Sequence, residues 1–151
     1  MNKENKNIIE KITNFIKSKE DIRFAYVFGS FALANVSAKS RTNVEISSLN
    51  KKNFNDIDMG IYLSKDSTQD TLSLELELEN ELESILHIPI DVRIINYAPL
   101  SFQYNVIKTG ILIVDNDTDF RVDFEGLTLK KYFDFVHLRN EYLREIVNAK
   151  F

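Results

Sequence analysis

The chain has 151 residues, a formal net charge of −4 and no cysteine. Its length is that of one ordinary domain, so we predict a single domain over residues 1–151. The lack of cysteine excludes a disulfide framework, thiolate metal ligands and a cysteine nucleophile. The negative charge argues against bulk attraction to nucleic acid or to an anionic membrane surface.

The first third of the chain predicts a helix, a strand and a loop. Apolar residues recur at helical spacing over residues 5–18, and this segment lacks the apolar stretch of a signal peptide or membrane span, so we expect a cytoplasmic protein. "IRFAYVF" (22–28) is aromatic and β-branched, which favours a strand that ends in a tight turn at Gly29-Ser30. Residues 33–55 are rich in Ser, Asn and Lys, which predicts a surface loop with a helical turn at its start.

The middle of the chain contains one clear strand and one ambiguous segment. "DIDMGIYL" (56–63) alternates, with four apolar residues on one face and Asp56, Asp58, Gly60 and Tyr62 on the other. "LSLELELENELESIL" (72–86) also alternates in part, but its leucines form a helical stripe as well. Because Glu and Leu favour helices, and because Ser67 and Asp70 resemble a helix-start box, we predict a helix.

The last third predicts a strand, a helix, a short strand and a long helix. These elements are "IDVRII" (90–95), a helix from Pro99 to about Gly110, "ILIV" (111–114) and a helix over about 119–148 that could be interrupted at Gly126. Six residues form an apolar stripe on the long helix, namely Leu129, Tyr132, Phe133, Val136, Leu143 and Val147. We interpret its aromatic residues as core or as a partner-binding face rather than as a base-stacking site.

Three aspartates carry the chemical signal. Asp56 and Asp58 share one face of a strand, about 6.6 Å apart along the chain, and Asp91 begins a second strand with the same apolar-in, acid-out pattern. We therefore expect helices mainly on one side of a sheet and the aspartates on the other, if the two strands are neighbours. Two bare carboxylates about 5 Å apart repel by roughly 3 kcal/mol at an effective dielectric of about 20. A hard, oxygen-preferring cation such as Mg²⁺ or Mn²⁺ would reverse that repulsion.

Gly29 and Ser30 in "FGSFALA" (28–34) suit phosphate binding. Glycine lets the backbone approach a phosphate closely, and the Ser30 hydroxyl and following amides can donate to its oxygens. His87 and His137 have no second ligand at metal spacing, and we interpret both as structural or surface residues. Arg93, on the same strand face as Asp91, is either its ion-pair partner or a phosphate contact.

Gly29-Ser30, Asp56-Ile57-Asp58 and Asp91, in this order, resemble the signature of the nucleotidyltransferase superfamily, and within it the minimal nucleotidyltransferases of prokaryotes. The resemblance covers most of the chain and implies an α/β (α+β) fold with a mixed β-sheet. It implies that Asp56, Asp58 and Asp91 hold two divalent ions, that Asp91 helps deprotonate the acceptor hydroxyl, and that Gly29 and Ser30 position a nucleoside triphosphate.

The resemblance implies transfer of a nucleoside monophosphate, AMP from ATP being the leading choice, to a hydroxyl. Members of this family act as antitoxins that modify a tyrosine of a small helical HEPN-type toxin, which we expect as the partner. Leu33 and Ala34 stand where the family has Arg and Gly, and the spacer to Asp56 is long. An alternative is therefore a catalytically weak or inactive module that neutralises its partner by binding. A third possibility is transfer to a small-molecule hydroxyl.

Overall fold

The computed structural model describes residues 3–35, 56–64 and 70–149. In chain order the elements are α1 (Lys3–Lys17), β1 (Ile22–Phe28), α2 (Gly29–Asn35), β2 (Ile57–Leu63), α4 (Thr71–Leu86), β3 (Ile90–Ile94), α5 (Leu100–Thr109), β4 (Ile111–Asp115) and α6 (Thr118–Ala149). The predicted helices and strands are confirmed with small shifts at their ends. The predicted loop lies mostly in residues 36–55, outside the described residues, as does Ser67.

The four strands form one mixed sheet in the order β3-β2-β1-β4, so the predicted mixed sheet is confirmed. β1 pairs antiparallel with β2 and with β4, whereas β2 and β3 pair in parallel. Parallel neighbours need a crossover connection, and α4 provides it between β2 and β3. The two acid-bearing strands are therefore neighbours, which the sequence did not show.

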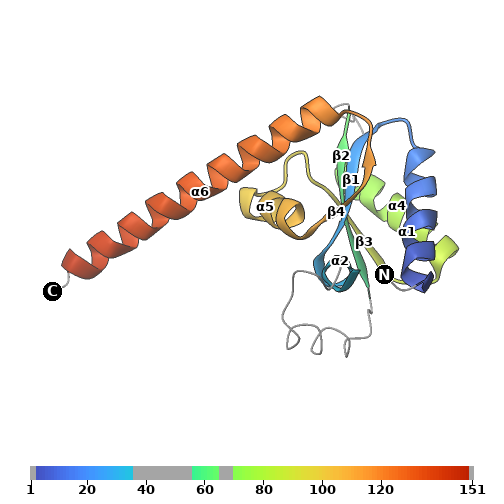
Figure 1. Ribbon diagram of the computed structural model, residues 1–151, viewed down its shortest axis with the longest axis horizontal. Coiled ribbons are helices and arrows are strands. Elements are labelled where there is room, and N and C mark those ends of the chain that lie inside the picture. Colours follow the sequence, from blue (N-terminus) through green and yellow to red (C-terminus); the bar gives the residue numbers. More distant parts are fainter. Residues whose placement is uncertain (1–2, 36–55, 65–69, 150–151) are drawn as a thin grey trace.

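Two apolar layers hold the sheet between helices. On one face, α1 and α4 pack Ile12, Ile16, Leu78 and Leu82 against the apolar residues of β2. On the other face, Phe24, Tyr26 and Phe28 of β1 pack against Val106 of α5 and against Phe120 and Phe124 of α6. Figure 1 shows α1 and α4 on one side of the sheet and α5 and α6 on the other. Helices α5 and α6 therefore cover part of the acid-bearing face, whereas the sequence predicted helices mainly on the opposite face.

The Glu-rich segment is a helix whose glutamates close the edge of the sheet. Asp70 caps α4, its side chain accepting from the Leu72 N–H at 3.2 Å. Glu75, Glu79 and Glu83 then accept the backbone N–H groups of Ile94, Val92 and Ile90 at 2.9, 2.9 and 3.0 Å. Because β3 is the outer strand, these N–H groups have no strand partner, and the carboxylates take that place.

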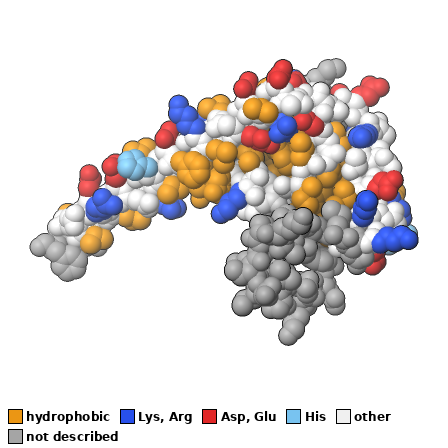
Figure 2. All heavy atoms as spheres, viewed as in Figure 1, with side chains coloured by type: hydrophobic (Ala, Val, Ile, Leu, Met, Phe, Trp, Pro, Cys, Tyr) orange, Lys and Arg blue, Asp and Glu red, His pale blue; other side chains and the backbone are white. Residues whose placement is uncertain are grey.

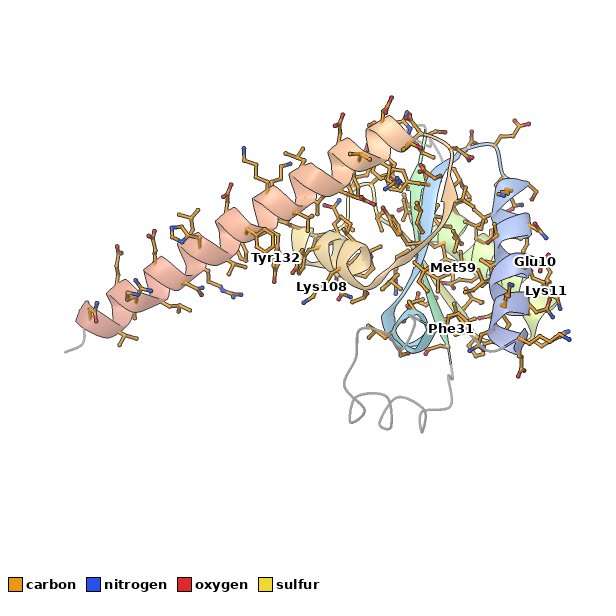
Figure 3. The ribbon with its side chains drawn as sticks, viewed as in Figure 1. Glu10, Lys11, Phe31, Met59, Lys108 and Tyr132 are labelled. Carbon is orange, nitrogen blue, oxygen red and sulfur yellow. The ribbon has the colours of Figure 1, made fainter. Side chains whose placement is uncertain are left out.

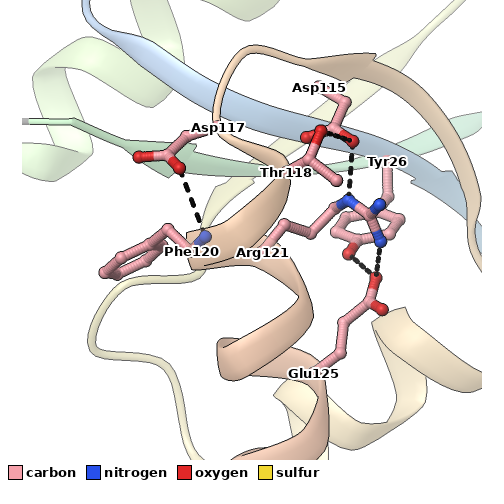
Figure 4. Close-up of polar contacts among 7 residues, drawn as sticks. All are labelled: Tyr26, Asp115, Asp117, Thr118, Phe120, Arg121 and Glu125. Atoms are coloured by element: carbon pink, nitrogen blue, oxygen red, sulfur yellow. Dashed lines mark hydrogen bonds and ion pairs between the residues drawn. The ribbon is translucent and has the colours of Figure 1, made fainter.

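The long helix α6 is continuous through Gly126, and its first half packs on the body of the molecule. Arg121 donates to Asp115 at 2.9 Å and to Glu125 at 3.0 Å, and the Tyr26 hydroxyl also donates to Glu125 (Figure 4). Burial, followed by the hydrogen bond to Glu125, raises the pKa of Tyr26. Further along, the Tyr132 ring stacks on Tyr104 of α5 at 3.7 Å between ring centres. Beyond that stack the helix extends away from the body of the molecule (Figure 1).

Candidate functional site

The sheet register brings two of the three predicted aspartates directly together. Asp58 of β2 is paired with Asp91 of β3 and, on its other side, with Phe28 at the end of β1. Asp56 lies just before β2 and is exposed, whereas Asp58 and Asp91 are half-buried. Since Gly29 follows Phe28, the Gly-Ser turn lies next to Asp58.

A side chain at position 29 would collide with the Asp58 carboxylate. Its φ is +75°, a conformation that side-chain-bearing residues rarely adopt, and a Cβ there would lie 2.6 Å from Asp58 Oδ2. Its N–H donates to the Thr109 hydroxyl at 3.5 Å, which connects the turn to the end of α5. Ser30 follows as a half-buried residue in the first turn of α2. No side chain therefore separates the backbone of Gly29 from the Asp58 carboxylate. A site that binds a phosphate together with a metal ion requires this arrangement.

The electrostatics of Asp58 are unfavourable for its charged form. Burial raises its pKa, and the nearby Asp56 and Asp91 raise it further, while Arg93 acts in the opposite direction. The carboxylates thus repel one another across the β2–β3 pair. The register places Asp91 beside Asp58, and both Asp56 and Asp91 raise the pKa of Asp58; a metal-binding role for the three aspartates stays a prediction.

Arg93 forms ion pairs with two acids at this site. Its Nε lies 3.3 Å from Asp91 Oδ1, and its NH1 nitrogen lies 3.8 Å from Glu75 Oε2. The ion-pair role predicted for Arg93 is therefore confirmed, and contact with a phosphate stays a prediction. Sequence analysis missed Glu75 and Thr109 at this site. The spacing of Glu75, Glu79 and Glu83 by four residues was the available signal for Glu75, whereas nothing marked Thr109.

The donor set fits a hard divalent cation in its chemistry. Three carboxylates, two of them in register on adjacent strands, match the oxygen ligands that Mg²⁺ and Mn²⁺ prefer, and the repulsion on Asp58 is what a cation would relieve. Within residues 3–35, 56–64 and 70–149, however, no three acidic or histidine side chains converge closely enough to form a metal cage. Asp91 instead points to Arg93.

The two histidines lie at the surface, and Leu33 lies in α2. His87 caps α4 in a left-handed conformation, and His137 is 72% exposed and pairs with Glu141 at 3.2 Å, so the surface interpretation of both histidines is confirmed. Leu33 is half-buried in α2. The basic residues between Leu33 and Asp56, namely Lys39, Arg41, Lys51 and Lys52, lie outside the described residues.

The chain belongs to the nucleotidyltransferase family. The family model described as polymerase beta, nucleotidyltransferase matches residues 10–119, which include all five predicted site residues. No curated protein matches the chain in sequence. No helix among the described residues is both long and apolar enough to cross a membrane.

Solved structures with the same fold include chains from two-protein complexes. One is described as the tri-AMPylated HEPN toxin of Shewanella oneidensis in complex with MNT antitoxin, with 17% identity, 95% of this chain and 98% of that chain covered, and a TM-score of 0.64. Another, the toxin–antitoxin MntA–HepT, has 17% identity, 94% and 98% coverage and a TM-score of 0.63. A third, a toxin–antitoxin with AMP-PNP, has 18% identity, 92% and 98% coverage and a TM-score of 0.64. At these identities the likeness shows the fold.

Proposed function

We propose that this chain is a metal-dependent nucleotidyltransferase that moves AMP from ATP to a hydroxyl of a partner protein. We further propose that the partner is a helical HEPN-type toxin and that the chain acts as its antitoxin in the cytoplasm. The observation that carries the activity is the direct pairing of Asp58 with Asp91 beside the bare backbone of Gly29. The names of the similar structures, which include an AMPylated toxin, an MNT antitoxin and AMP-PNP, support the nucleotide and the partner.

The site residues divide the work of an in-line transfer. Asp56, Asp58 and Asp91 would hold Mg²⁺ or Mn²⁺, two ions being expected with nucleotide, and these supply electrostatic stabilisation of the triphosphate when bound. Gly29 and Ser30 would contact the triphosphate, and the absence of a side chain at Gly29 keeps the space beside the Asp58 carboxylate open. Asp91, oriented by Arg93 at 3.3 Å, accepts the proton of the attacking hydroxyl. The hydroxyl oxygen bonds to the α-phosphorus as the α–β bond breaks and pyrophosphate leaves.

Label transfer tests the activity. Purified chain, Mg²⁺, ATP labelled at the α-phosphate and a purified HEPN-type toxin are combined, and the toxin should become labelled. Asp58→Asn should abolish labelling, whereas Asp123→Asn, an exposed acid on α6, should label at the wild-type rate. Wild-type protein that neither labels the toxin nor binds Mg²⁺–AMP-PNP would overturn the proposed activity.

A non-catalytic binding module is the second candidate, and Leu33 is the observation that favours it. An apolar, half-buried side chain stands where the family resemblance implies an arginine for the phosphates. The two candidates differ in a growth assay with the toxin expressed. If Asp58→Asn protects cells as well as wild type does, neutralisation depends on binding; loss of protection supports transfer.

A further inference from the structure

The distal part of α6, residues 133–147, carries large apolar side chains that the body of the molecule does not cover. Six of them are 51–64% exposed, namely Phe133, Phe135, Leu138, Tyr142, Leu143 and Val147. Upstream, Val122 and Leu127 are also exposed, but Thr128 is buried and Tyr132 stacks on Tyr104. Figure 3 shows Tyr132 at the junction with α5, close to Lys108, and Figure 2 shows hydrophobic surface along the helix. Monomeric soluble proteins seldom leave so continuous an apolar surface uncovered.

Three of these exposed residues, Phe133, Leu143 and Val147, follow the spacing of a helix that packs on another helix, together with half-buried Val136 and the polar Asn140. Phe133, Val136, Asn140, Leu143 and Val147 are separated by three, four, three and four residues, which is the a/d spacing of a coiled coil. We call these five residues the distal seam. Because an α-helix rises about 1.5 Å per residue, the distal seam is long enough for a partner helix of three to four turns.

The charges beside the distal seam select the kind of partner. The positions that border a coiled-coil interface, e and g, hold His137, Arg139, Arg144 and the apolar Ile146, and Lys130 occupies the e position one heptad earlier. The acids of this part of the helix, Asp134, Glu141 and Glu145, occupy positions b and f, away from the interface. The charged residues that border the seam are therefore basic, and the acids lie on the opposite side of α6, where Phe135, Leu138 and Tyr142 also lie.

This charge pattern disfavours a second copy of the chain. In an antiparallel pair, e faces e and g faces g, and in a parallel pair g faces e, so each arrangement places basic side chains beside basic side chains. A helix of another protein with Asp and Glu at its borders would instead be complementary.

We infer that the distal seam of α6 is the docking surface for an amphipathic helix of a different, helical protein whose apolar stripe is bordered by acids. Phe135, Leu138 and Tyr142 occupy positions c and f, on the other side of α6 from the distal seam, and are not part of this docking surface. This inference rests on the proposed function, because we take the docked protein to be the one that accepts the nucleotide. It goes beyond that function because it assigns the docking helix and the charge of the partner.

Two labelled peptides test the inference. Both carry the same three heptads of apolar a and d residues, one with Glu and the other with Lys at every e and g position. Fluorescence anisotropy should show that the Glu peptide binds the wild-type chain at least about tenfold more tightly than the Lys peptide, with an affinity that falls as salt rises. Leu143→Glu should abolish binding, and the double variant Arg139→Glu/Arg144→Glu should reverse the preference.

Leu72→Glu is the matched control, because Leu72 of α4 is 55% exposed, similar to Leu143, but lies away from the seam. It should bind as wild type does. Equal binding of the two peptides, or unchanged binding by Leu143→Glu, would overturn the inference. So would a wild-type dimer in sedimentation that Leu143→Glu converts to a monomer. Titration with Mg²⁺–AMP-PNP tests the proposed function separately. Binding of the Glu peptide without binding of the nucleotide refutes only the activity. Binding of the nucleotide without binding of the Glu peptide refutes only the docking surface.

Discussion

Gly29 connects the backbone of the Gly-Ser turn with the acid of the neighbouring strand. The sequence suggested glycine for close approach of a phosphate. The structure adds that the same glycine makes room for Asp58 and adopts a positive φ. Gly126, in the exposed part of α6, has neither constraint, since a Cβ there would meet no atom within 4 Å. The two glycines form a matched pair for substitution.

Gly29→Ala should destabilise the protein by about 2 kcal/mol or more, because the left-handed conformation alone costs roughly 1–2 kcal/mol and the new methyl group displaces Asp58. Mg²⁺ affinity should fall with it. Gly126→Ala should instead stabilise the protein by up to about 1 kcal/mol, since alanine is the better helix former. Urea unfolding measures both changes. Equal and small effects of the two substitutions would contradict the geometry described for Gly29.

The charged carboxylate of Asp58 suits metal binding but lowers the stability of the metal-free protein. Because its folded-state pKa is raised above the ordinary value, folding favours the protonated carboxyl. The stability that this group contributes is present at acid pH and is lost as the pH rises through the folded-state pKa. At neutral pH the ionised side chain is therefore a net disadvantage to the metal-free protein.

Asp58→Asn should raise the melting temperature slightly at neutral pH in the presence of EDTA and should flatten the fall in stability between acid and neutral pH. Mg²⁺ should raise the melting temperature of the wild type but not of this variant. Scanning calorimetry with and without the ion gives both results, with Asp123→Asn as the exposed control. A lower melting temperature of Asp58→Asn in EDTA would show that the carboxylate stabilises the fold.

At the scale of elements, α4 resolves the conflict in the Leu/Glu segment. Three of its glutamates, Glu75, Glu79 and Glu83, recur every four residues on the side that faces β3, and each of these accepts one edge N–H. The alternation of Leu and Glu imitates a strand, but it belongs to a helix that has two functions. Its leucines pack in the core, and its glutamates bind the N–H groups at the edge of the sheet. An open edge strand invites pairing with other chains, so this closure also protects against association.

Glu79→Ala should cost about 1 kcal/mol, because the Val92 N–H loses its acceptor. Hydrogen exchange of the Val92 amide should accelerate. Glu77→Ala, on the exposed side of the same helix, should leave both quantities unchanged. Replacing Glu75, Glu79 and Glu83 together should cause self-association detectable by light scattering. A triple variant that stays monomeric would show that the edge is protected in another way.

At the scale of the whole molecule, α6 divides into two parts with different partners. Its first turns belong to the second apolar layer and to the Arg121 network. Its distal part, predicted from its stripe as core or as a partner-binding face, is not core, because Phe133, Leu143 and Val147 are exposed. The first part of α6 therefore belongs to the folded domain, and the distal part provides the proposed docking surface for another protein.

We expect residues 1–151 to unfold as one unit, because both apolar layers share the same sheet. Circular dichroism follows the helices, and tyrosine fluorescence follows the rings that pack on β1, in a chain with no tryptophan. The two urea transitions should coincide. Two separated transitions would contradict the single-domain prediction.

The sequence by itself determined the type and order of the elements, the face of β2 on which the aspartates lie, and the family. These features depend on local periodicity and on short motifs, which a chain displays directly. Only the tertiary structure decided that β2 and β3 are neighbours, that Arg93 pairs with Asp91, that the glutamates of α4 close the edge and that distal α6 is bare. Each of these depends on contacts between residues far apart in the chain, and the free energy of such contacts is set by packing and register that no local pattern records.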